Sequence, residues 1–282
     1  RLSHESKSNK DVELSKSKNM KFCISNLAWT KSETKDALIL LKKKGIRFLE
    51  YSPNLLLDNC NSKKEIKIVK NFWKINNVKL YSMQSILNEI NNAYLFGTTS
   101  QKKIFYNEIK KKITLAKKLG TKVIVFGSPA SRKIFKNKKA SLDILAHKMF
   151  KKISLLCEKH KIIFCLEANA KIYKTKYLTH TSDAINLAKK INNNYFKINL
   201  DLGTIIANKE NFNSLIKKNL NLIGHVQISS PHLKNLLKYK TKIKLFIRSL
   251  KKLGYKKVVS VEMLKNKNNN LTNVNKILNL LN

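Results

Sequence analysis

The chain has 282 residues and a formal net charge of +41, because 58 lysine and arginine residues outnumber 17 aspartate and glutamate residues. This length suits one α/β barrel, and no apolar run approaches the 18 or more residues of a membrane span. The four cysteines show neither metal-type pairing nor a short secreted framework. We therefore expect a reduced, cytoplasmic protein with no membrane partner.

The positive charge is spread along the chain instead of being gathered in one segment. Only four of the basic residues are arginines, and lysines occur in nearly every predicted helix together with many asparagines and isoleucines. A surface that binds nucleic acid concentrates its charge and uses arginine for bidentate phosphate contacts. The pattern favours a composition that has drifted toward lysine, and a nucleic-acid partner is not expected.

Residues 1–19 are polar and have no apolar periodicity, which is typical of a disordered extension or linker. They contain acidic residues and no hydrophobic segment, unlike a secretory signal or a transit peptide. The folded domain is predicted to cover residues 20–282.

From residue 20 onward, short apolar runs alternate with lysine-rich amphipathic segments. The predicted strands lie in the ranges 21–29, 46–52, 78–84, 121–128, 161–168, 196–203, 222–229 and 256–264. Between the third and fourth of them, Ile109, Ile113 and Ala116 share one helical face, and Gly120 follows as the expected C-terminal residue. Eight strands separated by helices predict a single (β/α)₈ TIM barrel. A doubly wound open sheet is disfavoured, because no glycine-rich turn follows the first strand.

Polar residues stand at the carboxyl ends of these strands, where barrel enzymes carry out their chemistry. They are Glu50, Gln84, Ser128, Glu167, Asp201, Gln227 and Glu262. Carboxylates that meet in one cavity raise each other's pKa, and a divalent cation relieves that repulsion. Oxygen ligands alone favour Mg²⁺ or Mn²⁺. A single carboxylate in such a place also serves as a helix cap or a salt-bridge partner.

Other residues near the same end are candidates for substrate binding. The full set is Glu50, Gln84, Ser128, Arg132, Asn169, Lys171, Tyr173 and His225. Arg132 is a rare arginine in a chain dominated by lysine, which indicates bidentate contact with a carboxylate or phosphate, or a structural salt bridge. His225 faces the same side as Gln227 but lies two residues deeper, as an interior hydrogen-bonded residue or a substrate contact.

These residues also carry a family resemblance. The chain resembles the sugar phosphate isomerase/epimerase group of the xylose isomerase-like barrels in segments that span residues 20–264. The segments are "ISNLAW", "MQSIL", "LFG", "LAKKLGTKVIVFGSPASR", "LEANAKIYKTKYLTHT", "NLDLGTIIANKE", "HVQISSP" and "VSVEM".

The resemblance implies a metal site formed by Glu167, Asp201 and Glu262, with Gln227 as a fourth ligand. Many relatives have a histidine where this chain has Gln227, and another where it has Thr204. An amide oxygen suits a hard cation, so Mn²⁺ or Mg²⁺ is expected in preference to Zn²⁺.

The resemblance further implies isomerisation or epimerisation of a small carbohydrate, free or phosphorylated. Glu167 and Glu262 would exchange protons next to a carbonyl while the cation stabilises the enediolate. Alternatives are a metal-dependent dehydratase or lyase acting on a related polyol, and a barrel without catalysis that serves as a binding module. An endonuclease IV-like DNA-repair barrel is a weaker alternative, since that chemistry uses several histidines. A homodimer is compatible with the resemblance.

Overall fold

A computed structural model describes residues 20–135 and 139–281, and eight parallel strands form a closed barrel in chain order. The strands are β1 Phe22–Ser25, β2 Phe48–Tyr51, β3 Lys79–Met83, β4 Val123–Phe126, β5 Ile163–Glu167, β6 Phe196–Asp201, β7 Ile223–Ile228 and β8 Val259–Val261. Each lies within a range predicted from the sequence, so the (β/α)₈ fold is confirmed. The predicted disordered segment, residues 1–19, lies outside the described residues.

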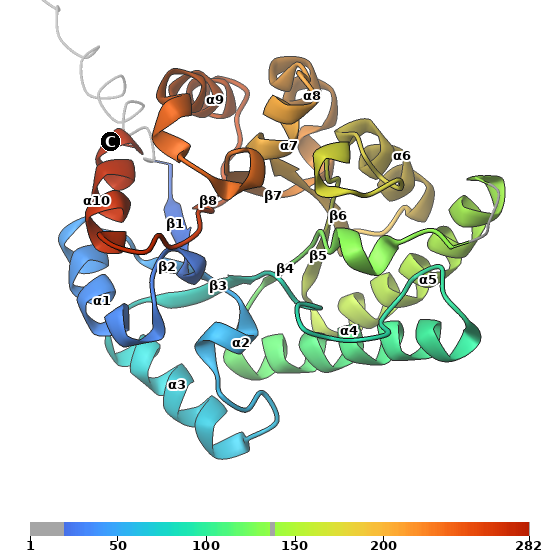
Figure 1. The fold of residues 1–282 in the computed structure, drawn as a ribbon, viewed down its shortest axis with the longest axis horizontal. Helices are drawn as coiled ribbons and strands as arrows, with labels where there is room; N and C mark the ends of the chain where they lie inside the picture. Colours follow the sequence, from blue (N-terminus) through green and yellow to red (C-terminus); the bar gives the residue numbers. More distant parts are fainter. Residues whose placement is uncertain (1–19, 136–138, 282) are drawn as a thin grey trace, which may run out of the picture.

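Helices surround the strands in chain order (Figure 1). They are α1 Thr34–Lys43, α2 Pro53–Leu56, α3 Lys63–Ile75, α4 Thr99–Leu119, α5 Lys139–His160, α6 Thr181–Ile191, α7 Leu202–Ala207, α8 Phe212–Asn219, α9 Lys240–Lys252 and α10 Asn270–Leu281. The last helix, α10, packs against both α1 and α9 and completes the ring. The left-handed Gly120 (φ 82°) ends α4, as its position in the sequence predicts.

The hydrophobic core lies between the strands and the helices. Phe126, Phe164 and Phe196 stack along β4, β5 and β6, with neighbouring ring centroids 5.7 Å apart, and Phe150 of α5 packs against them. A separate apolar cluster of Val123, Val125 and Cys165 forms from the alternate, inward-facing residues of β4 and β5. The barrel interior also holds buried polar side chains, and these build the candidate site.

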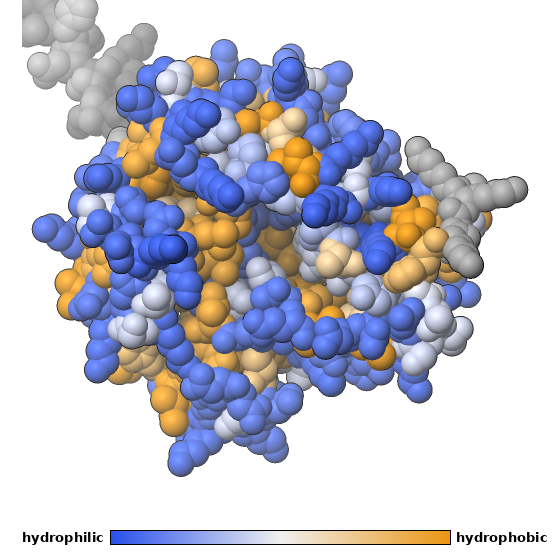
Figure 2. Space-filling view, viewed as in Figure 1, coloured by the Kyte–Doolittle hydropathy of each residue, from blue (hydrophilic) through white to orange (hydrophobic). Residues whose placement is uncertain are grey.

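The face of the molecule drawn in Figure 2 is largely hydrophilic. On the face drawn there, the ring of helices encloses a hollow in which hydrophobic side chains are visible. In the described part of the chain, no helix is both long enough and apolar enough to cross a membrane.

Candidate active site

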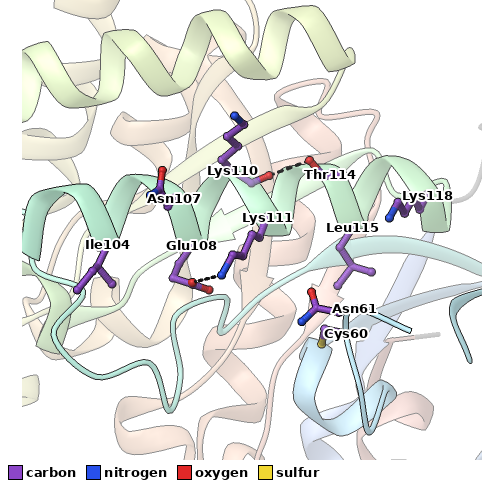
Figure 3. A pocket seen from close by; sticks show the side chains of 10 residues that line it. All are labelled: Cys60, Asn61, Ile104, Asn107, Glu108, Lys110, Lys111, Thr114, Leu115 and Lys118. Atoms are coloured by element: carbon purple, nitrogen blue, oxygen red, sulfur yellow. Dashed lines mark hydrogen bonds and ion pairs between the residues drawn. The ribbon is translucent and has the colours of Figure 1, made fainter. Parts of the chain in front are cut away.

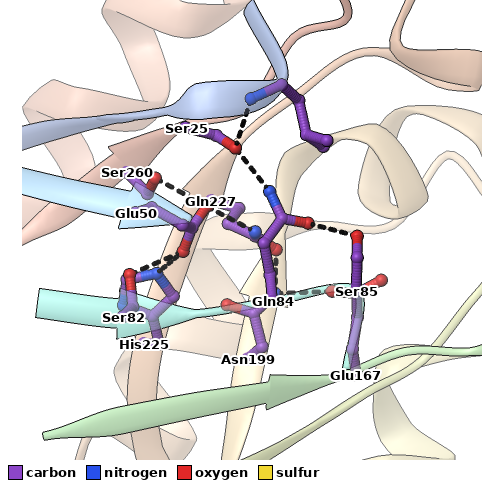
Figure 4. Close-up of polar contacts among 11 residues, drawn as sticks. Ser25, Glu50, Ser82, Gln84, Ser85, Glu167, Asn199, His225, Gln227 and Ser260 are labelled. Carbon is purple, nitrogen blue, oxygen red and sulfur yellow. Dashed lines mark hydrogen bonds and ion pairs between the residues drawn. The ribbon is translucent and has the colours of Figure 1, made fainter. Parts of the chain in front are cut away.

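A fully buried carboxylate, Glu50 of β2, lies at the centre of the interior polar cluster (Figure 4). Its Oε2 accepts hydrogen bonds from Ser82 Oγ (2.7 Å) and His225 Nε2 (2.8 Å). Its Oε1 accepts from Ser260 Oγ (2.7 Å) and Gln227 Nε2 (2.8 Å). Four donors use the four lone-pair positions of a carboxylate, so Glu50 has none left for the substrate contact predicted from the sequence.

The same donors keep Glu50 ionised. Burial alone would raise the pKa of Glu50, but the hydrogen bond and charge of His225, with the hydrogen bonds of Gln227 and Ser82, lower it below its ordinary value. His225 lies in the interior beneath Gln227, as strand alternation predicts, and its ring packs near that of Tyr81. Its contact with Glu50 assigns it to the interior network, which leaves its predicted substrate contact without support.

From Glu50 a chain of side-chain amides leads to Glu167 at the end of β5. Gln227 Oε1 accepts a hydrogen bond from Asn199 Nδ2 at 2.5 Å. The same Asn199 Nδ2 donates to Glu167 Oε2 at 2.8 Å. Asn199 and Gln227 are almost completely buried, whereas Glu167 is half-buried. The oxygen that Gln227 would offer to a metal therefore already accepts a hydrogen bond.

The other oxygen of Glu167 accepts from a second asparagine. Asn169 Nδ2 donates to Glu167 Oε1 at 2.5 Å, and Asn169 Oδ1 accepts from Arg132 Nη2. Arg132 is fully buried, and its Nη1 donates to the carbonyl of Tyr177 at 3.3 Å. Arg132 thus reaches the carboxylate of Glu167 through Asn169, and its contact with a substrate stays a prediction.

Asp201 ends β6 and caps the next helix. Its Oδ2 accepts from the backbone N–H of Thr204 at 2.8 Å, and its Oδ1 accepts from Ser229 Oγ. Thr204, at the position where the resemblance implies a histidine, donates its hydroxyl to the carbonyl of Ala168 at 3.0 Å. Asp201 is therefore the N-cap of α7 in this structure, the ordinary role for a carboxylate at a strand end.

The charged forms of the three predicted ligand carboxylates are disfavoured, chiefly by burial. Burial raises the pKa of Glu167 to about 8, with repulsion from Asp201 as the next cause. Burial and then repulsion from Glu167 raise the pKa of Glu262 well above its ordinary value, and burial also raises that of Asp201. Glu262 directly follows β8, and its backbone N–H donates to the carbonyl of Ile228 in β7. The mouth thus contains carboxyl groups whose ionised forms are only partly compensated by their hydrogen bonds.

The donor chemistry of these three carboxylates fits a hard divalent cation, which prefers oxygen ligands and would relieve their repulsion. Within residues 20–135 and 139–281, however, no three Asp, Glu, His or Cys side chains are grouped closely enough to hold an ion where they stand. Binding would require Glu167 and Asp201 to exchange some of their hydrogen bonds for the ion.

The remaining candidates surround this mouth. Gln84 is buried, donates to Ser25 Oγ at 2.7 Å and accepts from Ser85 Oγ at 3.1 Å. Ser128 is half-buried with a left-handed backbone (φ 41°), and Lys171 is exposed. The hydroxyl of Tyr173 accepts from the backbone N–H of His232 at 3.0 Å, which joins the β5 and β7 loops.

Sequence reasoning missed the interior members of the cluster. Asn199, Ser82 and Ser260 are buried and point inward from β6, β3 and β8. Asn199 lies two residues before Asp201, so the two-residue period of a strand places both on the same face. That signal was available, whereas the partners of the two serines depend on closure of the barrel.

A cavity of about 580 Å³ lies away from these strand ends, between the loop at Cys60 and helix α4 (Figure 3). Lysines of α4 line it, and Lys111 pairs with Glu108 at 2.7 Å. None of the candidate site residues lines this cavity, so the interior cluster is the better candidate for chemistry.

Solved structures of similar fold include sugar epimerases. A 3-keto-D-glucoside 4-epimerase from E. coli is 16% identical, with a TM-score of 0.75, over 93% of this chain and 99% of that chain. A D-psicose 3-epimerase is also 16% identical, with a TM-score of 0.69, over 92% and 90%. An AP endonuclease of family 2 from Brucella melitensis has 16% identity and a TM-score of 0.69, over 89% and 96%.

Identities this low establish the fold alone. No curated protein sequence matches the chain significantly. The family model described as the xylose isomerase-like TIM barrel matches residues 38–281, which include seven of the eight strands and the whole candidate site apart from Ser25. The chain therefore belongs to the xylose isomerase-like TIM barrel family.

Proposed function

We propose that this protein is a sugar isomerase or epimerase that moves a proton at a carbon next to a carbonyl group. The observation that carries the proposal is the pair of carboxyl groups, Glu167 and Glu262, whose pKa values are both raised at the mouth of the barrel. The likeness in fold to two sugar epimerases supports a small carbohydrate substrate.

Proton transfer next to a carbonyl needs one group that removes a proton and another that returns one. Burial, and then repulsion from Glu167, raises the pKa of Glu262, so the two carboxyls lose their protons in separate steps and do not ionise independently. Glu167 is also held on both oxygens by amide N–H groups, which fixes its direction. We assign the two proton transfers to this pair.

A divalent cation, Mn²⁺ or Mg²⁺, would be held by Glu167, Asp201 and Glu262. When bound, it would polarise the carbonyl and stabilise the negative charge that develops on the sugar oxygens. Gln227 is left out of this set, because its oxygen accepts from Asn199 and its nitrogen donates to Glu50.

The test is incubation with a panel of ketopentoses and ketohexoses, free and phosphorylated, in D₂O with added Mn²⁺. We expect a new epimer or isomer that carries deuterium at the carbon next to the carbonyl, observed by NMR. Glu167→Gln and Glu262→Gln should each lower kcat at least about a hundredfold, because each removes one proton-transfer group.

Glu108→Gln is the matched control, because Glu108 pairs with Lys111 on the outer helix α4, and its turnover should equal that of the wild type. Turnover that survives both single replacements at positions 167 and 262 would contradict the assignment. Loss of water from the sugar, in place of epimerisation, would favour the dehydratase alternative.

A further inference from the structure

The hydrogen bonds around Glu50 permit only one direction of donation. A carboxylate without a proton only accepts, so the nearby amide of Gln227 must present its nitrogen to Glu50. Turning this amide over would place its oxygen 2.8 Å from Glu50 Oε1, with no proton between the two acceptors. The ionised state of Glu50 therefore fixes the orientation of Gln227.

The orientation of the Gln227 amide in turn fixes the orientation of the Asn199 amide. With its nitrogen held by Glu50, Gln227 presents its oxygen to Asn199, which selects the Nδ2 group of Asn199 as donor. That group carries two hydrogens, one for Gln227 Oε1 and one for Glu167 Oε2. Among the described residues, the buried oxygen of Asn199 has no hydrogen-bond partner, so the donor side alone accounts for this orientation.

We propose that Glu50 is a positioning residue, which acts through Gln227 and Asn199 to hold a hydrogen-bond donor against Glu167. The inference rests on the proposed function, in which Glu167 transfers a proton. The chain of hydrogen bonds from Glu50 through Gln227 and Asn199 to Glu167 is called the relay below. Gln227 is its middle member, and in this role it is not a metal ligand. Arg132 acts likewise on the other side, because its guanidinium holds the oxygen of Asn169 and directs the nitrogen of Asn169 to Glu167.

The decisive substitution exchanges the hydrogen-bond donor at position 199 for an acceptor of nearly the same shape. Asn199→Asp replaces the donor by an acceptor that faces both Gln227 Oε1 and Glu167 Oε2. Measured at about pH 9, far above the ordinary pKa of an aspartate, this variant should melt at a lower temperature than the wild type. In its crystal structure Glu167 should have moved away from residue 199, and kcat should fall at least about tenfold, with KM changed much less.

Adding Glu50→Gln to this variant tests the relay itself. Without a charge at position 50, Gln227 is free to turn and present its nitrogen to the new aspartate. The double variant should therefore regain melting temperature over Asn199→Asp alone. Its kcat should stay low, because residue 199 still has no donor for Glu167. Combined with Asn199→Ala, Glu50→Gln should give no such gain in melting temperature, because alanine has no hydrogen-bonding group for Gln227 to face. Asn199→Ala also serves as a second variant if Asn199→Asp does not fold.

A control separates the relay from simple charge repulsion between positions 50 and 199. In a Gln227→Met background no amide links position 50 to position 199, so Glu50→Gln should no longer restore the melting temperature of Asn199→Asp. A rescue that persists there, or melting effects that are additive throughout, would overturn the relay. An unmoved Glu167 in Asn199→Asp would overturn the positioning role.

If the wild type turns over no sugar, the proposed function fails, while the melting and crystallographic results still decide the relay.

Discussion

At the scale of single residues, the clearest feature is a buried arginine. Arg132 is fully buried, and burial lowers the pKa of Arg132 to about 10 although the charge of Glu167 opposes this change. Its two terminal nitrogens reach Asn169 and the carbonyl of Tyr177, which requires the planar fork of a guanidinium. Its Nε lacks a partner among the described residues. The rarity of arginine in this chain is thus explained by geometry.

Arg132→Lys should lower the free energy of unfolding by about 3 kcal/mol, because an ammonium group cannot make both contacts and leaves buried acceptors unpaired. Urea unfolding followed by circular dichroism measures this change. Arg248→Lys is the control, since Arg248 is exposed on α9 and its replacement should change stability by less than about 0.5 kcal/mol. Equal effects of the two substitutions would mean that the fork of Arg132 is not needed.

At the scale of secondary-structure elements, the site depends on the close approach of two strand ends. Gly127 directly follows β4, and a Cβ atom there would lie 2.7 Å from Glu167 Oε1 and 3.3 Å from Asn169 Nδ2. Glycine at this position therefore lets the end of β4 lie directly beside the carboxylate that ends β5. The bonds from Asn169 and Asn199 then hold that carboxylate from two other directions.

Gly127→Ala should displace Glu167 and lower turnover of the accepted sugar by at least about tenfold, since misplacing a catalytic group by about an ångström is costly. Steady-state kinetics and a crystal structure of the variant check this. Gly97→Ala is the comparison, because its added Cβ would be crowded to a similar degree, 2.8 Å from the Cβ of Gln101, but away from Glu167. Wild-type turnover in Gly127→Ala would show that Glu167 does not need its present position.

At the scale of the whole molecule, the barrel gathers acidic groups inside a strongly basic protein. The net charge of +41 is carried largely by exposed lysines, whereas Glu50, Glu167, Asp201 and Glu262 lie in or at the mouth of the barrel. Glu50 is compensated by four donors, but the other three have raised pKa values. This imbalance makes stability depend on pH.

Without added metal, the melting temperature should fall as the pH rises from about 5 to about 8. The folded pKa of Glu167, about 8, exceeds the value of about 4.5 for an exposed carboxyl, so the folded state binds more protons within that window. Its contribution favours folding at the acidic end and is lost as the pH rises through 8. Thermal melts in EDTA measure this, and Glu167→Gln should weaken the dependence.

Added Mn²⁺ should raise the melting temperature of the wild type at about pH 8, where these carboxyls ionise, and raise it less in Glu167→Gln. An increase of equal size in both proteins would place the ion elsewhere. A pH-independent melting temperature in the wild type would contradict the raised pKa values.

The sequence by itself determined the architecture. All eight strands lie where short apolar runs were found, because strands buried on both faces need continuous apolar segments between amphipathic helices. The strand-end carboxylates Glu167, Asp201 and Glu262 could also be located, since their positions follow from the end of each run. Family motifs over residues 20–264 pointed to the same barrel, and the family is confirmed.

Only the tertiary structure decided the partners of these residues. Glu50 and Gln227 are 177 residues apart in the chain, and Glu50 and Ser260 are 210 apart. They meet because the closed barrel brings strands that are not neighbours together across its interior. Local patterns show which face a side chain takes, but the closure and register of eight strands decide what stands opposite. That is why Glu50 was placed at the mouth from sequence and belongs, by its contacts, to the interior.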